Sequence, residues 1–259
     1  MIPNKRKDQT CEIHGGFVSE QFKMAGNTFW TTCPECSINV LAEAKRESQE
    51  EVRRIQKEHR QAAINSRLNA AGVPVRFQDS SFDNYEATNE RQETVLNVVR
   101  TYADKFDELK ARGVSMIFTG DSGTGKTHLA CAVGNQIMRE GHTFVFIGMR
   151  QAIGQVRGAW DNKELSEQEV IERFVEPDLL VLDEIGVQFG TESERIIMFE
   201  IINGRYERMK PTILMTNLPA DDTDPNGIRA YLGARMFDRI RQDGGRVLKF
   251  NWPSHRGVA

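Results

Sequence analysis

Largely apolar segments, each ending in polar residues or glycine, mark the second half of the chain. They are Val114–Phe118, Asp178–Asp183 and Thr212–Asn217. Short apolar runs of this kind predict strands buried on both faces, as in a parallel sheet sandwiched by helices. Because the carboxyl ends of parallel strands share one edge of the sheet, the polar residues that end these runs are expected to lie on the same side. The pattern predicts an α/β fold.

From Ser37 to about Ala71 the composition changes to Glu, Lys, Arg, Gln and Ala with only sparse apolar residues. This composition is typical of a helix, and Gly72-Val-Pro74 supplies its stop signal. Two interpretations remain open for the helix. It is either a solvated, salt-bridged connector or a rod that docks on a partner.

The first 37 residues have a different character. Phe17–Lys23 and Thr28–Thr32 alternate around Gly26-Asn27, which predicts a hairpin. The residues Cys11, His14, Cys33 and Cys36 form two short-spaced pairs on glycine- and proline-containing turns. Such pairs predict a structural zinc ribbon, because three thiolates and one imidazole complete the tetrahedron that Zn²⁺ prefers.

A disulfide is not expected for these cysteines in a reducing cytosol, and Cys131 is expected in the core. The module is open to a protein or a DNA partner, because it also carries basic and aromatic residues suited to nucleic acid. These residues are Lys5, Arg6, Lys7, Lys23, Phe29 and Trp30.

The chain has 259 residues and a formal net charge of −3. This length accommodates one α/β core and a small appendage, and we divide it into a zinc module at 1–37, a connector at 38–72 and a core domain at 73–259. The charge argues against coating nucleic acid by bulk attraction. No apolar run is long enough for a membrane span and no secretion signal follows the basic start, so a cytoplasmic protein is expected.

A phosphate-binding loop follows the first buried strand. Its glycines allow backbone N–H groups to face an anion at the start of the next helix, Lys126 is suited to the β- and γ-phosphates of ATP, and the Thr127 hydroxyl is suited to Mg²⁺. The nucleotide contacts are expected from Gly120, Asp121, Ser122, Gly123, Thr124, Gly125, Lys126, Thr127 and His128.

The second strand ends in two carboxylates and the third in an amide. Asp183 is predicted to hold Mg²⁺ through water, and Glu184 is predicted to polarise the attacking water. Asn217 is a candidate for orienting that water or sensing the γ-phosphate, and an Asx turn is the alternative. The three strand ends and the loop together predict ATP hydrolysis.

From about Gly72 onward the chain resembles the DnaC/IstB-type AAA+ ATPases, bacterial and phage helicase loaders in particular. The matching motifs are GVPVRF at 72–77, SFDNY at 81–85, GDSGTGKTHL at 120–129, LDEIG at 182–186, TN at 216–217, GARMFDR at 233–239 and FNWPSHR at 250–256. The resemblance implies an AAA+ domain. Because the sequence stops three residues after Arg256, we expect its C-terminal lid to be reduced or absent.

The family also implies roles for single residues. Arg239, with Arg235 as the alternative, is implied as an arginine finger acting on a neighbouring subunit, and Arg256 as the sensor 2 arginine. A helical element between the P-loop and the strand that ends in Asp183 contacts single-stranded DNA in relatives. The residues carried over to that role are Trp160 for base stacking and Arg157 and Lys163 for phosphates; Trp160 alternatively packs at the core edge. Ser193 and Arg195, just after the acidic strand, are secondary candidates for the same groove.

The resulting hypothesis is an ATP-dependent helicase loader, bacterial or phage-encoded, that self-assembles and binds a replicative hexameric helicase and single-stranded DNA. An IstB-like helper that delivers a transposase is the alternative within the same family. A small-molecule P-loop kinase is a rival from another class, but no substrate-pocket motif supports it.

Overall fold

The computed structural model describes residues 3–24, 27–159, 166–186 and 191–255, with only the backbone described over 56–69. The chain divides into two compact units, residues 1–65 and residues 66–259. No helix in the described part of the chain combines the length and the apolar character that crossing a membrane requires.

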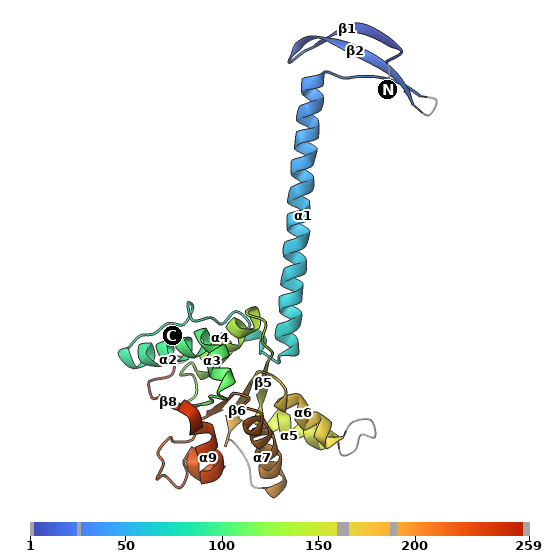
Figure 1. Cartoon of the computed structure of the whole chain (residues 1–259). Coiled ribbons are helices and arrows are strands. Elements are labelled where there is room, and N and C mark those ends of the chain that lie inside the picture. The colour runs from blue at the N-terminus through green and yellow to red at the C-terminus, as the bar shows by residue number, and fades with distance from the viewer. Residues whose placement is uncertain (1–2, 25–26, 160–165, 187–190, 256–259) are drawn as a thin grey trace. The chain divides into compact units, whose positions relative to one another are not determined.

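The first unit contains a three-stranded antiparallel sheet in the order β1-β2-β3 (Figure 1). Its strands are β1 (Lys5–Cys11), β2 (Gly15–Met24) and β3 (Asn27–Trp30). The predicted hairpin is confirmed as β2 and β3, in which Phe22 pairs with Phe29. The sequence reading missed β1, which pairs with β2 along its whole length.

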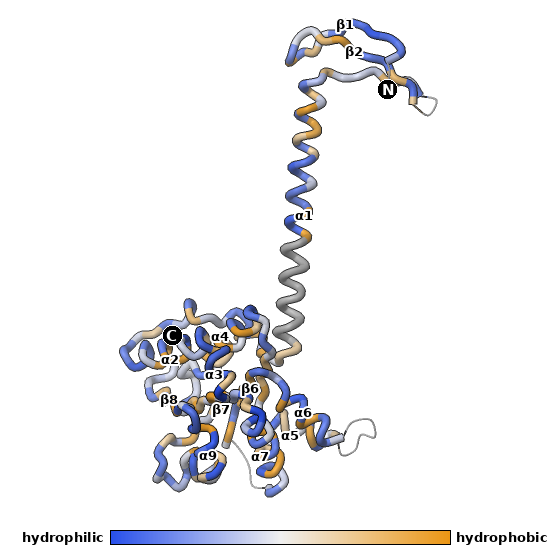
Figure 2. Tube along the Cα trace, viewed as in Figure 1, coloured by the Kyte–Doolittle hydropathy of each residue, from blue (hydrophilic) through white to orange (hydrophobic). Residues whose placement is uncertain are grey.

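The predicted connector is confirmed as helix α1 (Pro34–Ala70), which has 37 residues. Figure 2 shows the coloured first part of this helix as mainly hydrophilic, with a few apolar bands. Five large apolar side chains among the described residues of this helix are exposed: Ile38, Val40, Leu41, Val52 and Ile55. The helix therefore buries little apolar surface of its own within the described residues.

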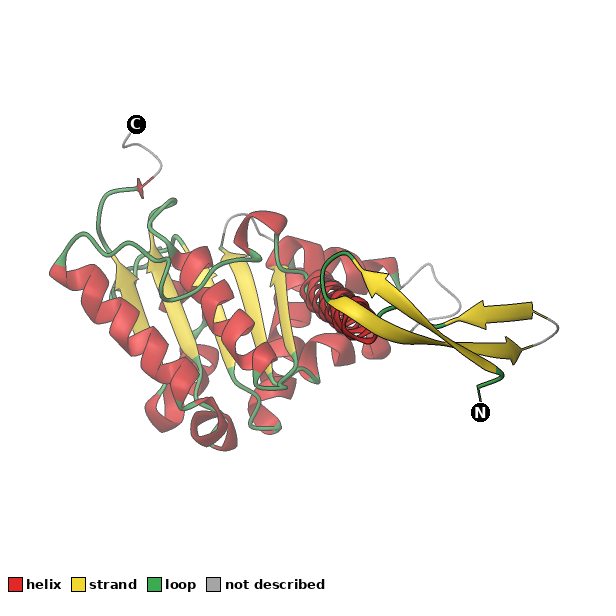
Figure 3. Cartoon of the chain, turned by 90° about the horizontal axis from the view of Figure 1, so that it is seen from above, coloured by secondary structure: helices red, strands yellow, loops and turns green. Residues whose placement is uncertain are grey.

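The second unit contains a five-stranded parallel sheet in the order β5-β6-β7-β4-β8 (Figure 3). Three of its strands were predicted. The strands are β4 (Met116–Gly120), β5 (Phe144–Gly148), β6 (Leu179–Ile185), β7 (Thr212–Thr216) and β8 (Arg246–Phe250).

Helices cover both faces of this sheet, because successive strand side chains point to opposite faces and each face is apolar. Met116 and Phe118 of β4 belong to the core under one set of helices, and Ile117 belongs to the core under the other. The first set is α2 (Glu90–Asp104), α3 (Phe106–Ala111) and α4 (Lys126–Arg139). The second is α5 (Met149–Gly158), α6 (Glu167–Val175), α7 (Glu192–Glu207), α8 (Ile228–Leu232) and α9 (Ala234–Arg241).

A strap, residues 71–85, leads from the end of α1 across α4 and contains the short helix η1 (Val75–Phe77). The Ala71 carbonyl accepts a hydrogen bond from the Phe146 N–H at 2.7 Å, on the edge strand β5. The buried Asn135 amide of α4 donates to three strap carbonyls, those of Phe77, Gln78 and Ser80. These bonds fix the strap beside the loop that precedes α4.

The guanidinium of Arg205 in α7 is fully buried. It donates to the Thr212 hydroxyl and to four carbonyls, those of Phe174, Val175, Pro177 and Pro211. Burial lowers the pKa of Arg205 to about 9, and neighbouring Tyr102 acts in the opposite direction. The five acceptors stabilise the buried charge, because a buried polar group without partners is costly.

Candidate nucleotide site and metal-ligating cluster

The glycine-rich loop lies between β4 and α4, as the sequence predicts. Gly123 and Gly125 have φ of +81° and +93°, a region that favours glycine. A Cβ on Gly125 would lie 2.7 Å from the ring of Tyr85, so the strap also requires glycine here. The loop is thus held in the conformation that turns backbone N–H groups toward an anion at a helix N-terminus.

The Lys126 side chain is mostly buried and lies inside the loop. Its Nζ donates to the carbonyls of Gly120 and Asp121, and to Asn217 Oδ1 at 3.0 Å. The same amide of Asn217 reaches toward Ser122 Oγ at 3.4 Å. The lysine of the loop and the polar end of β7 therefore meet, as the sequence predicts for adjacent strand ends.

The two carboxylates at the end of β6 lie on the same side of the sheet. Glu184 has φ of +60°, and its N–H donates to Asp183 Oδ1 at 2.7 Å. A non-glycine residue in this region costs about 1–3 kcal/mol and is typical of functional sites. Burial raises the pKa of Asp183, and Glu184 adds to the effect, which the backbone hydrogen bond and Lys126 oppose. A cation beside Asp183 would stabilise its ionised carboxylate and so counteract the effect of burial on its pKa.

A cavity of about 640 Å³ lies at this edge of the sheet, large enough for a nucleotide. Loop residues 122–128, Asp183, Glu184 and Asn217 line it, and so do strap residues that include Arg76 and Tyr85. The donors suit phosphates, and Thr127 with Asp183 offers the oxygen ligands that Mg²⁺ prefers. The residues present fit a magnesium–nucleotide complex.

The C-terminal segment holds the loop from a second side. Trp252 Nε1 donates to the Thr124 carbonyl at 2.9 Å, and the His255 N–H donates to the Gly123 carbonyl at 2.9 Å. Sequence reasoning assigned no role to these residues or to Tyr85, although all three lie in motifs of the resemblance. Isolated aromatic residues far from the loop in sequence carry no signal of such contacts.

The two arginine-finger candidates lie on α9 and do not line the cavity. Arg235 is exposed. Arg239 donates to Asn203 of α7 and lies over the ring of Tyr206, 4.8 Å from its centroid. The third predicted arginine, Arg256, lies outside the described residues.

The predicted DNA-contacting residues come together only in part. Arg157, at the end of α5, donates to the hydroxyls of Thr191 and Ser193 and pairs with Glu194 at 3.2 Å. Arg195 lies on the same helix as Glu194. Trp160 and Lys163 lie outside the described residues.

In the first unit, one ligand atom from each of the four predicted residues Cys11, His14, Cys33 and Cys36 lies within 4.8 Å of the others. Cys11 Sγ is 3.6 Å from Cys36 Sγ, and His14 Nδ1 is 3.3 to 3.8 Å from the three sulfurs. A tetrahedral zinc with the usual bond lengths places its ligands about 3.6 to 3.8 Å apart. The geometry fits such an ion.

The surroundings of the cluster favour a bound cation. Hydrogen bonds from the Ile13 and His14 N–H groups lower the pKa of Cys11 to about 6. His14 Nε2 lies 3.5 Å from a carboxylate oxygen of Glu35, an arrangement that orients metal-ligating imidazoles in proteins.

Comparison with known families decides the identity of the second unit. Residues 44–256 match the family model described as IstB-like ATP binding protein. The chain belongs to this family. It is therefore an AAA+ ATPase of the DnaC/IstB type, and its family supports ATP and Mg²⁺ as cofactors.

Two curated relatives from Escherichia coli strain K12 are similar over most of the chain. The replicative helicase loader DnaC is 32% identical over 78% of this chain and 79% of its own length. The uncharacterized protein YdaV is 32% identical over 81% of each chain. The crystal structure of the DnaC helicase loader superposes with a TM-score of 0.59 at 24% identity, covering 68% of this chain and 99% of that one, which establishes the same fold.

The contact between Trp252 and the loop yields a testable prediction. The substitution Trp252→Phe retains an aromatic ring but leaves the Thr124 carbonyl without its donor, a loss of about 1 kcal/mol. We expect ADP to bind about fivefold more weakly in isothermal titration calorimetry. Trp30→Phe makes the same chemical change in the first unit and should leave the affinity unchanged. Equal affinity of all three proteins would refute the role of Trp252.

Proposed function

We propose that this protein is an ATP-dependent helicase loader, which binds a replicative hexameric helicase in the bacterial cytoplasm and places it on single-stranded DNA. The similarity to the helicase loader DnaC over 78% of the chain is the observation that carries the proposal. The complete nucleotide site, with Lys126, Asp183, Glu184 and Asn217 together, supports a loader that uses ATP.

ATP acts as the switch in this proposal. Bound Mg²⁺–ATP supplies a γ-phosphate whose presence or loss changes the charge at the site. Lys126 would neutralise phosphate charge, while Thr127 and Asp183 would hold Mg²⁺. Glu184 would accept a proton from the attacking water on its carboxylate, and Asn217 would orient that water.

The proposed contact with single-stranded DNA centres on the junction of α5 and α7. Arg157, Ser193 and Arg195 supply a guanidinium, a hydroxyl and a second cation there. Cationic and hydroxyl side chains bind the phosphate backbone without reading sequence, which suits a loader acting on any exposed strand.

We assign zinc to the cluster of Cys11, His14, Cys33 and Cys36, as a structural ion that holds the first unit together. Four protein ligands leave no open position for catalysis. The module so formed is the proposed contact for the helicase.

Metal analysis tests the zinc assignment. We expect one zinc ion per purified chain by inductively coupled plasma mass spectrometry, and its loss in Cys36→Ser, since three ligands hold zinc poorly. Cys131→Ala removes a thiol of the ATPase core and should retain the metal. Equal metal content in wild type and Cys36→Ser, or no bound metal after expression with added zinc, contradicts the assignment.

Self-assembly is proposed to place Arg239, or alternatively Arg235, against the nucleotide of a neighbouring subunit. The variants Lys126→Ala and Arg239→Ala should each lose ATPase activity, the latter by about 10³-fold, while Arg239→Ala still binds ATP. Mixing the two should restore part of the activity, because a Lys126→Ala subunit supplies its arginine to the intact site of its neighbour.

Two controls complete this experiment. Asn203→Ala removes the contact that Arg239 makes within its own chain and should leave most activity. The same mixing with Arg235→Ala decides between the two arginines. If neither variant loses activity, the trans-acting arginine is refuted.

The partner itself is identified by native mass spectrometry of the full-length protein mixed with the hexameric replicative helicase of the same genome, with ATP and with ADP. We expect a defined complex, whose subunit ratio gives the assembly, and its loss when Cys36→Ser disrupts the module. No complex with either nucleotide would overturn the loader assignment. Capture of a transposase instead would favour the IstB-like helper.

A further inference from the structure

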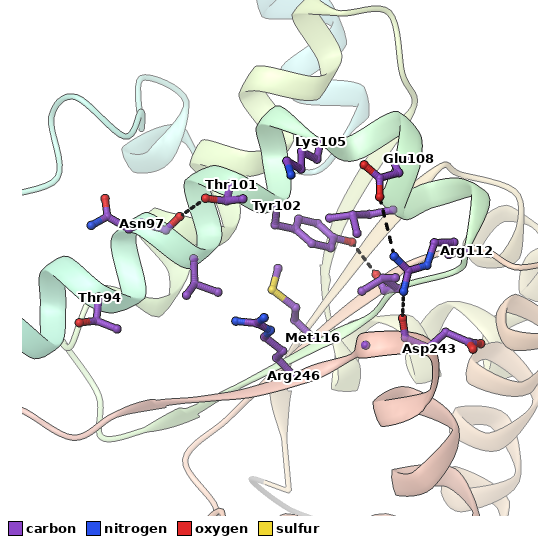
Figure 4. A pocket seen from close by; sticks show the side chains of 14 residues that line it. Thr94, Asn97, Thr101, Tyr102, Lys105, Glu108, Arg112, Met116, Asp243 and Arg246 are labelled. Atoms are coloured by element: carbon purple, nitrogen blue, oxygen red, sulfur yellow. Dashed lines mark hydrogen bonds and ion pairs between the residues drawn. The ribbon is translucent and has the colours of Figure 1, made fainter.

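A second cavity lies away from the nucleotide site, between α2, α3 and the start of β8 (Figure 4). It has a volume of about 590 Å³, and we call it the β8 groove. Val114, which precedes β4, Met116 of β4 and Arg246 of β8 line it from the sheet. These residues stand at the amino ends of parallel strands, whereas the P-loop follows the carboxyl end of β4. The groove and the nucleotide site therefore lie at opposite edges of the sheet.

The floor of the β8 groove is apolar. Met116 and Tyr102 are buried there, and Val98 and Leu109 are half-buried. The Tyr102 hydroxyl donates a hydrogen bond to the Val114 carbonyl at 2.9 Å. The hydroxyl thus has a partner within the protein, and the ring contributes apolar surface to the floor. An apolar side chain of a ligand would lose water by lying on this floor.

The rim of the β8 groove is exposed and carries Lys105 and Arg246. Among the described residues, neither of them forms an ion pair or a side-chain hydrogen bond, and Figure 4 shows the Arg246 side chain extending from β8 toward α2. Arg112, by contrast, donates to the Asp243 carbonyl at 2.8 Å and lies 3.8 Å from Glu108. Of the two acidic residues that line the groove, Glu108 already has a cation beside it, and Figure 4 shows the Asp243 carboxylate pointing away from Arg246. Lys105 and Arg246 remain available for an anionic group.

The shape of the groove indicates an extended ligand. Its α2 wall runs from Thr94 to Lys105, which at 1.5 Å per helical residue is about 16 Å. This is the length of about five residues of extended peptide. Small-molecule sites enclose most of their ligand, whereas this rim of exposed side chains leaves one side open. Thr94, Asn97 and Thr101 add polar side chains along the wall. The hydroxyls of Thr94 and Thr101 donate to carbonyls of α2, so toward a peptide backbone their oxygens serve as acceptors.

We propose that the β8 groove binds an extended acidic segment of a partner protein. One apolar side chain of the segment lies on the floor of Val98, Leu109 and Met116, and a carboxylate pairs with Arg246. This site is independent of the helicase-loader assignment and of the nucleotide, because its residues do not line the nucleotide cavity.

The test selects peptides from a random twelve-residue phage-displayed library on the full-length protein, with counterselection on Arg246→Glu. We expect enrichment of sequences that combine aspartate or glutamate with a large apolar residue. A fluorescein-labelled copy of a selected peptide should bind at least about tenfold more weakly to Arg246→Glu in fluorescence anisotropy, because like charges across an interface repel. Thr101→Trp, which fills the groove without changing charge, should weaken binding similarly.

Lys249→Glu makes the same charge reversal on the same strand, outside the groove, and should bind the peptide within about twofold of wild type. ADP affinity should be the same in all these proteins, which separates a local effect from unfolding. Selection that enriches no acidic and apolar sequence, or peptides that bind Arg246→Glu and Thr101→Trp as tightly as wild type, would overturn the proposal. Selective competition by inorganic phosphate at equal ionic strength, without acidic peptide binding, would show a small-anion site instead.

Discussion

The buried guanidinium of Arg205 is the interaction on which the arrangement of the nucleotide site depends. It donates hydrogen bonds to two carbonyls at the end of α6, to the Pro177 carbonyl before β6, and to the Pro211 carbonyl and Thr212 hydroxyl at the start of β7. A buried cation needs all these acceptors, so the amino ends of two adjacent strands are fixed relative to each other. Parallel strands of defined length then bring Asp183 and Asn217 to the same edge, beside Lys126.

Contacts from both ends of the ATPase sequence hold the phosphate-binding loop. Tyr85 of the strap lies against Gly125, and Trp252 donates to the Thr124 carbonyl. The loop sequence permits the required backbone conformation, and these neighbours select it from the alternatives that glycine allows. The shape of the nucleotide site is therefore a property of the whole domain.

Much of the fold and of the nucleotide site could be predicted from the sequence, and there is a physical reason why the remaining contacts could not. The P-loop, the carboxylates of β6 and the cluster of Cys11, His14, Cys33 and Cys36 are recognised because their spacing along the chain is itself the signal. Trp252 lies 128 positions along the chain from Thr124, and Tyr85 lies 40 positions from Gly125, so no local sequence pattern encodes these two contacts. The strands β1 and β8 were missed for a related reason, since their polar or mixed sequences become strands through pairing with neighbours. The strand β5 was overlooked although its sequence, FVFIG, is a buried apolar run like those of the three predicted strands. The arginine-finger role predicted for Arg239 or Arg235 requires a second subunit, so it stays a prediction.

The position of β8 has a consequence for how the protein is made. The strand that carries the P-loop lies between β7 and β8, and both β8 and Trp252 come from the last part of the sequence. On a ribosome, the amino-terminal module and most of the sheet emerge well before these residues. Domains fold as units when their sequence is complete. The contact of Trp252 with the phosphate-binding loop, and the pairing of β8 with β4, can therefore form in a nascent chain only after residues 246–252 have emerged.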